Sequence, residues 1–335
     1  GAGRGPALAE PEVGRGDPMA LLLNESEVTM LLPMSLALEA VEEAFRWQGE
    51  GKLTNKPRVR LPVPGGLMHV MPAALPEARV MGLKAYATVR GGAKFVVLLF
   101  SAETGSLLAV IEADKLGQTR TGAASGVATR HLAREDADCV GCYGTGWQAR
   151  SQLEAVCAVR RVREVRVYGR DPSRRARFAE EVGSMLGVPV VAVDRPEAAA
   201  RGASILITIT SSKTPVLEGR WIEPGAHVNA AGSNALQRAE IDVEAVRRAS
   251  LVVTDSLEQA HLECGDLVAA LEQGAIRWED VHELGEVVAG RRPGRTRSEQ
   301  ITLFESQGAA MEDMAVAVRV LARARERSMG TEIPI

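Results

Sequence analysis

The sequence contains few cysteines, few histidines and few aromatic residues. It has 4 Cys and 5 His in 335 residues, and aromatic side chains make up 4% of the chain. No two histidines stand in the i, i+4 spacing that would bring them together on one helix face. Cys139 and Cys142 form a Cys-x-x-Cys, but their odd separation within a strand points the two thiols to opposite faces. The sequence therefore predicts neither a metal site nor a redox pair, and so few thiols suit a reducing compartment such as the cytoplasm.

An excess of one charge and long apolar runs are missing as well. The formal net charge is -3, so nothing in the charge balance predicts binding to nucleic acid or to an acidic membrane. The apolar run at 95–100 has the length of a strand and falls short of the roughly 18 residues that a membrane helix needs. Residues 1–18 are rich in glycine, proline and arginine and lack the apolar core of a secretory signal. We interpret them as a disordered leader or a cloning remnant.

The hydrophobic pattern divides the rest of the chain into two parts. Helical periodicity over 24–49, with Asn24 and Ser35 as caps, is followed over 58–112 by short extended runs between prolines and glycines, which predicts an antiparallel sheet. A helix at 121–133 is rich in small residues, which would let a neighbouring helix or a cofactor approach closely. From 137 onward apolar strands alternate with helices, the pattern of a doubly wound parallel sheet. The expected strands are 138–143, 164–168, 188–193, 203–209, 226–231 and 250–254, followed by an extended run near 300–306 and a terminal helix over 308–327 that returns to the first part.

The most informative motif of the second part is Gly144-Thr145-Gly146-Trp147-Gln148-Ala149, which lies between an apolar strand and a helix. This Gly-x-Gly-x-x-Ala turn has the form of a dinucleotide-binding unit, in which free backbone N–H groups at the start of the helix bind a pyrophosphate. Gly144 allows the tight turn, Gly146 the close approach of the phosphate, and Ala149 the close packing of helix on strand. Glycine-rich turns are common, but further strand–helix units follow this one. That context predicts a Rossmann-type domain.

The end of the next strand bears on the choice of cofactor. Chains that bind NAD place Asp or Glu about 20 residues beyond the glycine turn, where it binds the ribose 2′-hydroxyl. Here that position is Gly169, with Arg170 next to it and Arg174 one turn further on. An arginine without the acid suits a 2′-phosphate, so NADP(H) is the preferred cofactor and NAD(H) a possible one. The alternative is that Arg170 is a surface residue and Asp171 caps the following helix.

Polar residues also follow the fourth and fifth expected strands, at 208–212 and 229–234. Ligands bind at the carboxyl ends of strands in open α/β sheets. Residues of both segments are therefore expected in the ligand site, the alternative being that they only form loops.

Three basic residues of the first part point to the substrate. Arg58 follows a proline, Lys84 lies inside the apolar run 80–89, and Arg120 directly precedes the small-residue helix. A lysine in a half-buried strand costs desolvation free energy unless it meets an anion. As a set the three cations suit a carboxylate, which arginine binds with a planar fork and lysine as a point charge. Each alone is equally explained as an exposed edge cation, and His69 either faces the same site or is an ordinary strand residue.

Motifs along 19–327 together resemble the ornithine cyclodeaminase/mu-crystallin family. The matching segments are Pro57-Arg58, 71–73, 82–84, 98–109, 118–124, 144–146, 225–229, 240–242, 285–287 and 306–313. The resemblance implies a homodimer of two-domain subunits. A substrate-binding and dimerisation domain would combine residues 19–132 with 305–335, and a Rossmann domain would span 133–304. Arg58, Lys84 and Arg120 would hold the α-carboxylate of the substrate.

The resemblance also implies a reaction. Members exchange a hydride between nicotinamide and the α-carbon of an imine or amine. The expected cofactor-binding residues are Thr121, Gly144, Thr145, Gly146, Trp147, Gln148, Ala149, Arg170, Thr208, Thr210, Ser233 and Gly308.

One position departs from the cyclodeaminases. Where they carry an aspartate, this chain has Asn234, and an amide neither binds a second amino group as a carboxylate does nor passes protons. Ornithine cyclisation is therefore less favoured than reduction of a ketimine carboxylate, cyclic or formed from a 2-oxo acid and an amine. Lys84 and Asn234 are the expected catalytic residues, and Lys84 or a bound water would supply the proton. The alternatives are an alanine-type dehydrogenase that uses ammonia and a mu-crystallin-like protein that binds NADPH and a small carboxylate ligand.

Overall fold

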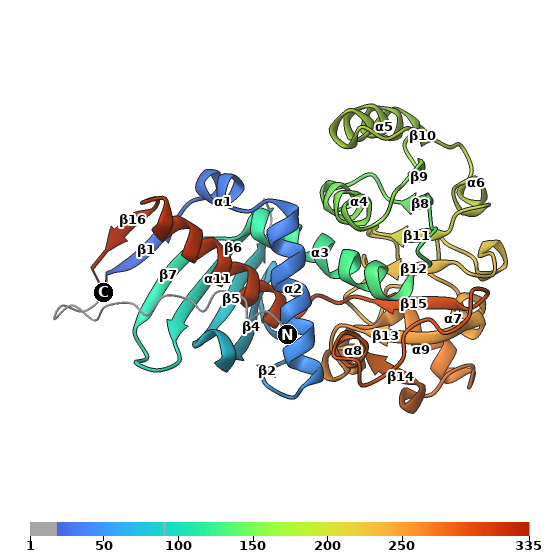
Figure 1. The fold of residues 1–335 in the computed structure, drawn as a ribbon. Coiled ribbons are helices and arrows are strands. Elements are labelled where there is room, and N and C mark those ends of the chain that lie inside the picture. The colour runs from blue at the N-terminus through green and yellow to red at the C-terminus, as the bar shows by residue number, and fades with distance from the viewer. Residues whose placement is uncertain (1–18, 90–91, 335) are drawn as a thin grey trace, which may run out of the picture.

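The computed structural model describes residues 19–89 and 92–334. The leader expected over 1–18 lies outside these residues. The described chain forms two sheets that lie side by side, each with its own helices (Figure 1). One sheet is parallel and the other largely antiparallel, so the predicted α/β fold class with a Rossmann-type sheet is confirmed.

The first sheet is built from short strands near both ends of the chain and longer ones between them. They are β1 (Ala20–Leu23), β2 (Thr54–Asn55), β3 (Val59–Val63), β4 (Gly66–Leu75), β5 (Val80–Val89), β6 (Gly92–Ser101), β7 (Leu107–Glu112) and β16 (Thr331–Ile333). The order is β16-β1-β7-β6-β5-β4-β2, and β3 also pairs with β4. Strands β1 and β7 run parallel, and the other pairs run antiparallel.

Four helices of this half are α1 (Glu25–Leu31), α2 (Met34–Gly49), α3 (Asp114–Leu132) and α11 (Ala310–Glu326). Asn24 caps α1 as predicted, since its side chain accepts hydrogen bonds from the backbone N–H groups of Ser26 and Glu27. The cap of α2 is Pro33 and not the predicted Ser35. Proline has no N–H group to leave unpaired, so the helix can begin directly after it.

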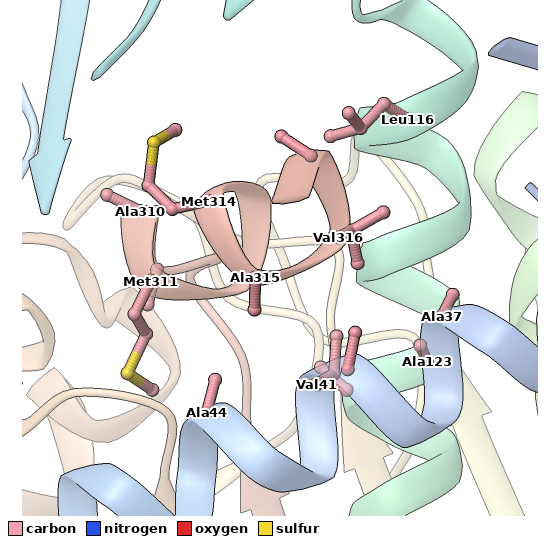
Figure 2. Close-up of a cluster of buried hydrophobic side chains, with 14 of the residues drawn as sticks. Ala37, Val41, Ala44, Leu116, Ala123, Ala310, Met311, Met314, Ala315 and Val316 are labelled. Carbon is pink, nitrogen blue, oxygen red and sulfur yellow. The ribbon is translucent and has the colours of Figure 1, made fainter. Parts of the chain in front are cut away.

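Helix α11 lies against the first sheet and contacts β4, β5, α2 and α3. Figure 2 shows its apolar side chains between the neighbouring helices. The cluster includes Ala310, Met311, Met314, Ala315 and Val316 of α11, Ala37, Val41 and Ala44 of α2, and Leu116 and Ala123 of α3. Many of these side chains are small, which lets the three helices pack at short distance. The domain boundaries at 132/133 and 304/305 stay predictions.

Helix α3 begins at Asp114, well before the predicted start at 121. Its first two turns carry Gln118, Thr119 and Arg120, which are polar yet buried, so they give no apolar periodicity to recognise. The helix leads from the first sheet to the second (Figure 1). Its small residues do face neighbouring helices. A Cβ at Gly122 would lie 2.3 Å from the Ser151 carbonyl oxygen.

The second sheet is parallel throughout its described strands, in the order β10-β9-β8-β11-β12-β15-β13-β14. Its strands are β8 (Cys139–Tyr143), β9 (Glu164–Tyr168), β10 (Val190–Ala192), β11 (Ile205–Thr208), β12 (His227–Ala230), β13 (Ala249–Thr254), β14 (Val281–Glu283) and β15 (Ile301–Glu305). The helices are α4 (Trp147–Val159), α5 (Pro172–Leu186), α6 (Pro196–Ala200), α7 (Val243–Arg248), α8 (Leu257–Glu263), α9 (Gly265–Glu272) and α10 (Leu284–Val288). Cys139 and Cys142 of β8 belong to different apolar clusters, as expected for opposite faces. Within the described ranges, no helix has both the length and the apolar character needed to cross a membrane.

Candidate active site

A cavity of about 1260 Å³ is lined by residues of both halves of the chain. The first half contributes strands β3 to β6 and helix α3, and the second half contributes the segments that follow β8, β9, β11, β12 and β15. The predicted site residues on its wall are Arg58, His69, Lys84, Arg120, Thr121, Gly144, Thr145, Gly146, Trp147, Gln148, Arg170, Thr210, Asn234 and Gly308. Residues predicted from distant parts of the sequence therefore meet around one space.

Three predicted cofactor residues are not on the cavity wall. Ala149 is fully buried in the apolar core, in keeping with its expected packing role. Thr208 is fully buried at the end of β11, and Ser233 donates a hydrogen bond of 2.9 Å to the Arg238 carbonyl oxygen. Ser233 thus holds its own loop. Of the two predicted threonines at the end of β11, Thr210 lines the cavity and Thr208 does not.

The glycine turn has the geometry of an anion site. Gly144 has φ +122°, and a Cβ there would lie 2.3 Å from the Ile209 carbonyl oxygen, so a larger residue is excluded. Gly146 caps α4 with no side-chain hydrogen bond, and a Cβ at this position would meet nothing within 4 Å. The first N–H groups of α4 are therefore left for a ligand to satisfy. These features fit the pyrophosphate of a dinucleotide.

The strand β9 ends in the segment that was expected to select the cofactor. Asp171 does cap α5, because its side chain accepts a hydrogen bond of 2.9 Å from the Arg174 backbone. Arg170 and Arg174 are exposed, yet both line the cavity. Neither side chain has an ion-pair partner among the described residues. The two guanidinium groups are thus available to an anionic ligand.

The predicted cations form a buried cluster with acidic partners. Lys84 Nζ lies 2.6 Å from Asp313 Oδ2, and Arg120 Nε lies 2.9 Å from Asp313 Oδ1. Arg120 also pairs with Glu312 at 2.8 Å, and Arg58 pairs with Glu263 at 2.8 Å. We call Arg58, Lys84 and Arg120 the cation clamp. Its acids compensate much of the cost of burying the positive charges and keep the side chains oriented.

Sequence reasoning did not identify these acidic partners. Glu312 and Asp313 are fully buried within α11, on a helix whose other buried residues are mostly apolar. Two adjacent acids inside an apolar helix pattern are a signal that buried cations must face them. Glu263, at the end of α8, offers no comparable sequence signal.

The cluster shifts the charge state of its members. Burial, assisted by the neighbouring Arg120, lowers the pKa of Lys84 to about 7 even though Asp313 opposes the shift. Burial also raises the pKa of Glu312 above its usual range. Lys84 therefore changes charge near neutral pH, as a group that exchanges protons with a substrate should.

Arg60 and His69 complete the wall around the clamp. Arg60 was not predicted; its guanidinium lies 2.6 Å from Glu263 Oε1 and donates to the Asn234 carbonyl oxygen at 2.9 Å. The His69 ring stacks on Tyr86 with a centroid distance of 4.2 Å. Burial, with Arg58 and Arg60 nearby, lowers the pKa of His69 to about 4, so its imidazole is neutral at physiological pH. The cavity thus combines an anion-binding turn with a clamp for a second anion.

Comparison with known proteins agrees with this chemistry. The family model for the ornithine cyclodeaminase/mu-crystallin family matches residues 19–328. The solved structure of Thermococcus litoralis Δ1-pyrroline-2-carboxylate reductase with NADH and L-proline is 36% identical, with a TM-score of 0.89, and the match covers 93% of this chain and 100% of that one. An archaeal alanine dehydrogenase dimer with bound NAD is 36% identical with a TM-score of 0.89, over 95% and 100% of the two chains. The iminosuccinate reductase of Paracoccus denitrificans with NAD+ is 30% identical with a TM-score of 0.90, over 95% and 100%.

Each of these structures contains a nicotinamide cofactor, and each similarity extends over nearly the whole chain. Like these three proteins, the chain is an oxidoreductase that uses a nicotinamide cofactor. By its fold, its motifs and the match to the family model, it belongs to the ornithine cyclodeaminase/mu-crystallin family.

Proposed function

We propose that this protein uses NAD(P)H to reduce the C=N bond of a ketimine carboxylate to an amino acid. The imine is either cyclic or formed from a 2-oxo acid and an amine. In balanced form, imine, NAD(P)H and one proton give the amine and NAD(P)+, and the reverse reaction oxidises an amino acid.

The observation that carries this proposal is the position of the cation clamp in the same cavity as the glycine turn. A carboxylate bound to Arg58, Lys84 and Arg120 would fix one end of the substrate, and such positioning supplies much of the rate of a two-substrate reaction. The bound cofactor would donate the hydride. The turn at 144–149 and the side chain of Arg170 would hold its phosphates.

Lys84 has a second proposed role beside anchoring. Since its pKa lies at about 7, its ammonium form can give up a proton near neutral pH. Asn234 lies on the cavity wall where cyclodeaminases have a carboxylate. Its amide can orient the substrate nitrogen by a hydrogen bond and carries no charge to repel or attract it.

The test is NADPH consumption with pyrroline-2-carboxylate and with a panel of 2-oxo acids, each combined with methylamine or ammonia. We expect oxidation of NADPH with at least one imine, and a Lys84→Ala variant should lose most of that activity. Tight NADPH binding without turnover of any imine would instead favour a binding protein.

A second candidate, an alanine-type dehydrogenase, is favoured by the archaeal alanine dehydrogenase of similar fold. The panel separates the two functions. Turnover restricted to a 2-oxo acid with free ammonia would indicate the dehydrogenase, whereas turnover of preformed cyclic imines or methylamine adducts would indicate the imine reductase.

We further propose that NADP(H) is preferred over NAD(H). Gly169 offers no carboxylate for a 2′-hydroxyl, and Arg170 and Arg174 line the cavity beside it. The catalytic efficiency with NADPH should therefore exceed that with NADH, and a double variant of Arg170→Ala with Arg174→Ala should lose about tenfold or more with NADPH alone. Equal efficiencies with the two cofactors in the unaltered protein would overturn this preference.

The active form is proposed to be a homodimer. Helices α11 and α3 pack against the first sheet, and α2 packs on these two helices. Apolar residues of its strands remain exposed, among them Val59, Leu61, Val63, Met68 and Met81. An apolar surface of this kind is typical of a subunit interface.

A further inference from the structure

Glu240 is a buried acid outside the cation clamp, in the chain segment between β12 and α7, and its carboxylate connects two loops of the cavity. Oε1 accepts a hydrogen bond of 2.5 Å from the Thr210 backbone N–H, in the loop after β11. Oε2 accepts one of 2.8 Å from the Gly232 backbone N–H, in the loop after β12. The residue is fully buried. One side chain thus links the ends of two neighbouring parallel strands.

The chemistry of the two contacts requires a carboxylate. Both groups that it binds are backbone donors, and a carboxylate can accept from both at once, one at each oxygen. The isosteric amide of glutamine would turn an NH2 group toward one of these N–H groups. Glu240 has no ion-pair partner in the part of the chain that the structure describes. Burial raises the pKa of Glu240 to about 7. The hydrogen bonds from Thr210 and Gly232 stabilise the carboxylate and so oppose this rise in pKa.

The loops are packed too closely for this contact to be incidental. A Cβ at Gly232 would lie 2.4 Å from Glu240 Oε2 and 2.5 Å from the Thr210 nitrogen, so only glycine allows the contact. On the other side, a Cβ at Gly144 would lie 2.3 Å from the Ile209 carbonyl oxygen. The glycine turn therefore rests on the loop after β11, and that loop is joined through Glu240 to the loop after β12.

Glu240 is itself held in place. Its backbone N–H and that of Ile241 both donate to Asp266 Oδ1, at 2.5 and 3.0 Å. Its carbonyl oxygen accepts hydrogen bonds from Val216 and Leu217 at 2.8 and 3.0 Å. The carboxylate is thus presented from a fixed backbone and can determine where the two loops lie.

We propose that Glu240 is a positioning residue that sets the spacing of the loops after β11 and β12 and thereby the shape of the cofactor-binding cavity. Ile209, Thr210, Ala231 and Gly232 line that cavity. Asn234, two residues beyond Gly232, accepts the hydrogen bond from Arg60. Glu240 thus acts on the ligand through these loops. The proposal rests on the binding of a nicotinamide cofactor and does not depend on which imine is reduced.

The test compares Glu240→Gln with Glu305→Gln. Glu305 is a fully buried acid at the end of β15, but its carboxylate accepts only from the Cys264 thiol, at 3.4 Å, among the described residues, and it does not line the cavity. Burial raises the pKa of Glu305 well above its usual range. The dissociation constant of NADPH is measured by its fluorescence on binding, and folding by circular dichroism and thermal unfolding.

We expect Glu240→Gln to bind NADPH about tenfold more weakly, the equivalent of about 1.4 kcal/mol, and Glu305→Gln to bind it as the unaltered protein does. Since Glu240→Gln could fail to fold, Gly232→Ala serves as a second variant that opens the same contact from the loop side, and it should weaken NADPH binding in the same way. A lowered melting temperature with unchanged NADPH affinity in the folded variants would overturn the proposal. Equal weakening in Glu305→Gln would overturn it too. Because NADPH binding is measured without substrate, a wrong imine assignment would leave this result unaffected.

Discussion

Lys84 is the residue whose charge we expect to set the pH response of the enzyme. In the proposed function its ammonium form would attract the substrate carboxylate, and its pKa is lowered to about 7 by burial and by Arg120. Below that pH the clamp carries the extra positive charge, and above it Lys84 becomes neutral and the attraction weakens. The affinity for a carboxylate should therefore fall as the pH rises through about 7.

The inhibition constant of pyrrole-2-carboxylate measures this effect, because the ring nitrogen of this planar analogue does not titrate in the range. A Lys84→Arg variant is the matched control, since arginine stays charged at every pH used. We expect the variant to lose the alkaline decline that the unaltered enzyme shows. An identical decline in both proteins would assign the titration to another group.

Among single residues, the buried cations could be predicted from the sequence, but the acidic residues that pair with them could not. Lys84 was recognisable because a charged residue inside an apolar strand pattern needs an anion nearby. Arg60 was missed, although it lies two residues after Arg58 and the strand period of two places both side chains on one face. That this face lines the cavity is visible only in the structure. Glu263 comes from a helix more than 200 residues away from its partner Arg58, and no local pattern reports such a contact.

Among the elements, α3 offers a test of why its residues are small. A Cβ at Gly122 would lie 2.3 Å from the Ser151 carbonyl oxygen in α4, whereas a Cβ at Gly117 of the same helix would meet nothing within 4 Å. Gly122→Ala should force α3 and α4 apart and lower the free energy of unfolding by about 1–3 kcal/mol. Gly117→Ala should leave it unchanged or raise it by up to about 1 kcal/mol, because alanine favours a helix.

Urea unfolding of the two variants measures the difference. Both substitutions add one methyl group to the same helix, so helix propensity cancels between them and the remaining effect reports the contact with α4. Equal stabilities would mean that α3 adjusts its position without cost.

The elements that could be predicted are those with a clear period. Strands β5, β6 and β8 were evident from apolar runs bounded by turns. The short strands β1, β14 and β16 were not foreseen, because their pairing depends on distant partners. The equally short β10, β11 and β12 were predicted because they belong to the regular alternation of strands and helices. The early turns of α3 were missed for a different reason: they are buried by the site and carry polar side chains.

At the scale of the whole molecule, the sequence predicts which residues make up the candidate site, but only partly how they come together in space. The glycine turn and the clamp were each recognised from sequence, but their meeting in one cavity depends on how the two sheets are joined. Helix α3 runs from one sheet to the other, and α11 returns the chain from β15 to the first sheet (Figure 1). Both helices carry clamp residues or their partners, Arg120 on α3 and Asp313 on α11. The elements that join the two halves therefore also build the proposed substrate site.

The exposed side of the first sheet is the proposed interface between two subunits. Leu61 and Met68 are directly paired across β3 and β4, and both are more than 40% exposed. Since a stable interface buries about 800 Å² per partner, a charge at its centre should separate the subunits. Leu61→Asp should convert the proposed dimer to a monomer in light scattering. Met185→Asp alters an equally exposed methionine on α5, away from this sheet, and should leave the dimer intact. A dimer that survives Leu61→Asp and dissociates with Met185→Asp would place the interface on the Rossmann half instead.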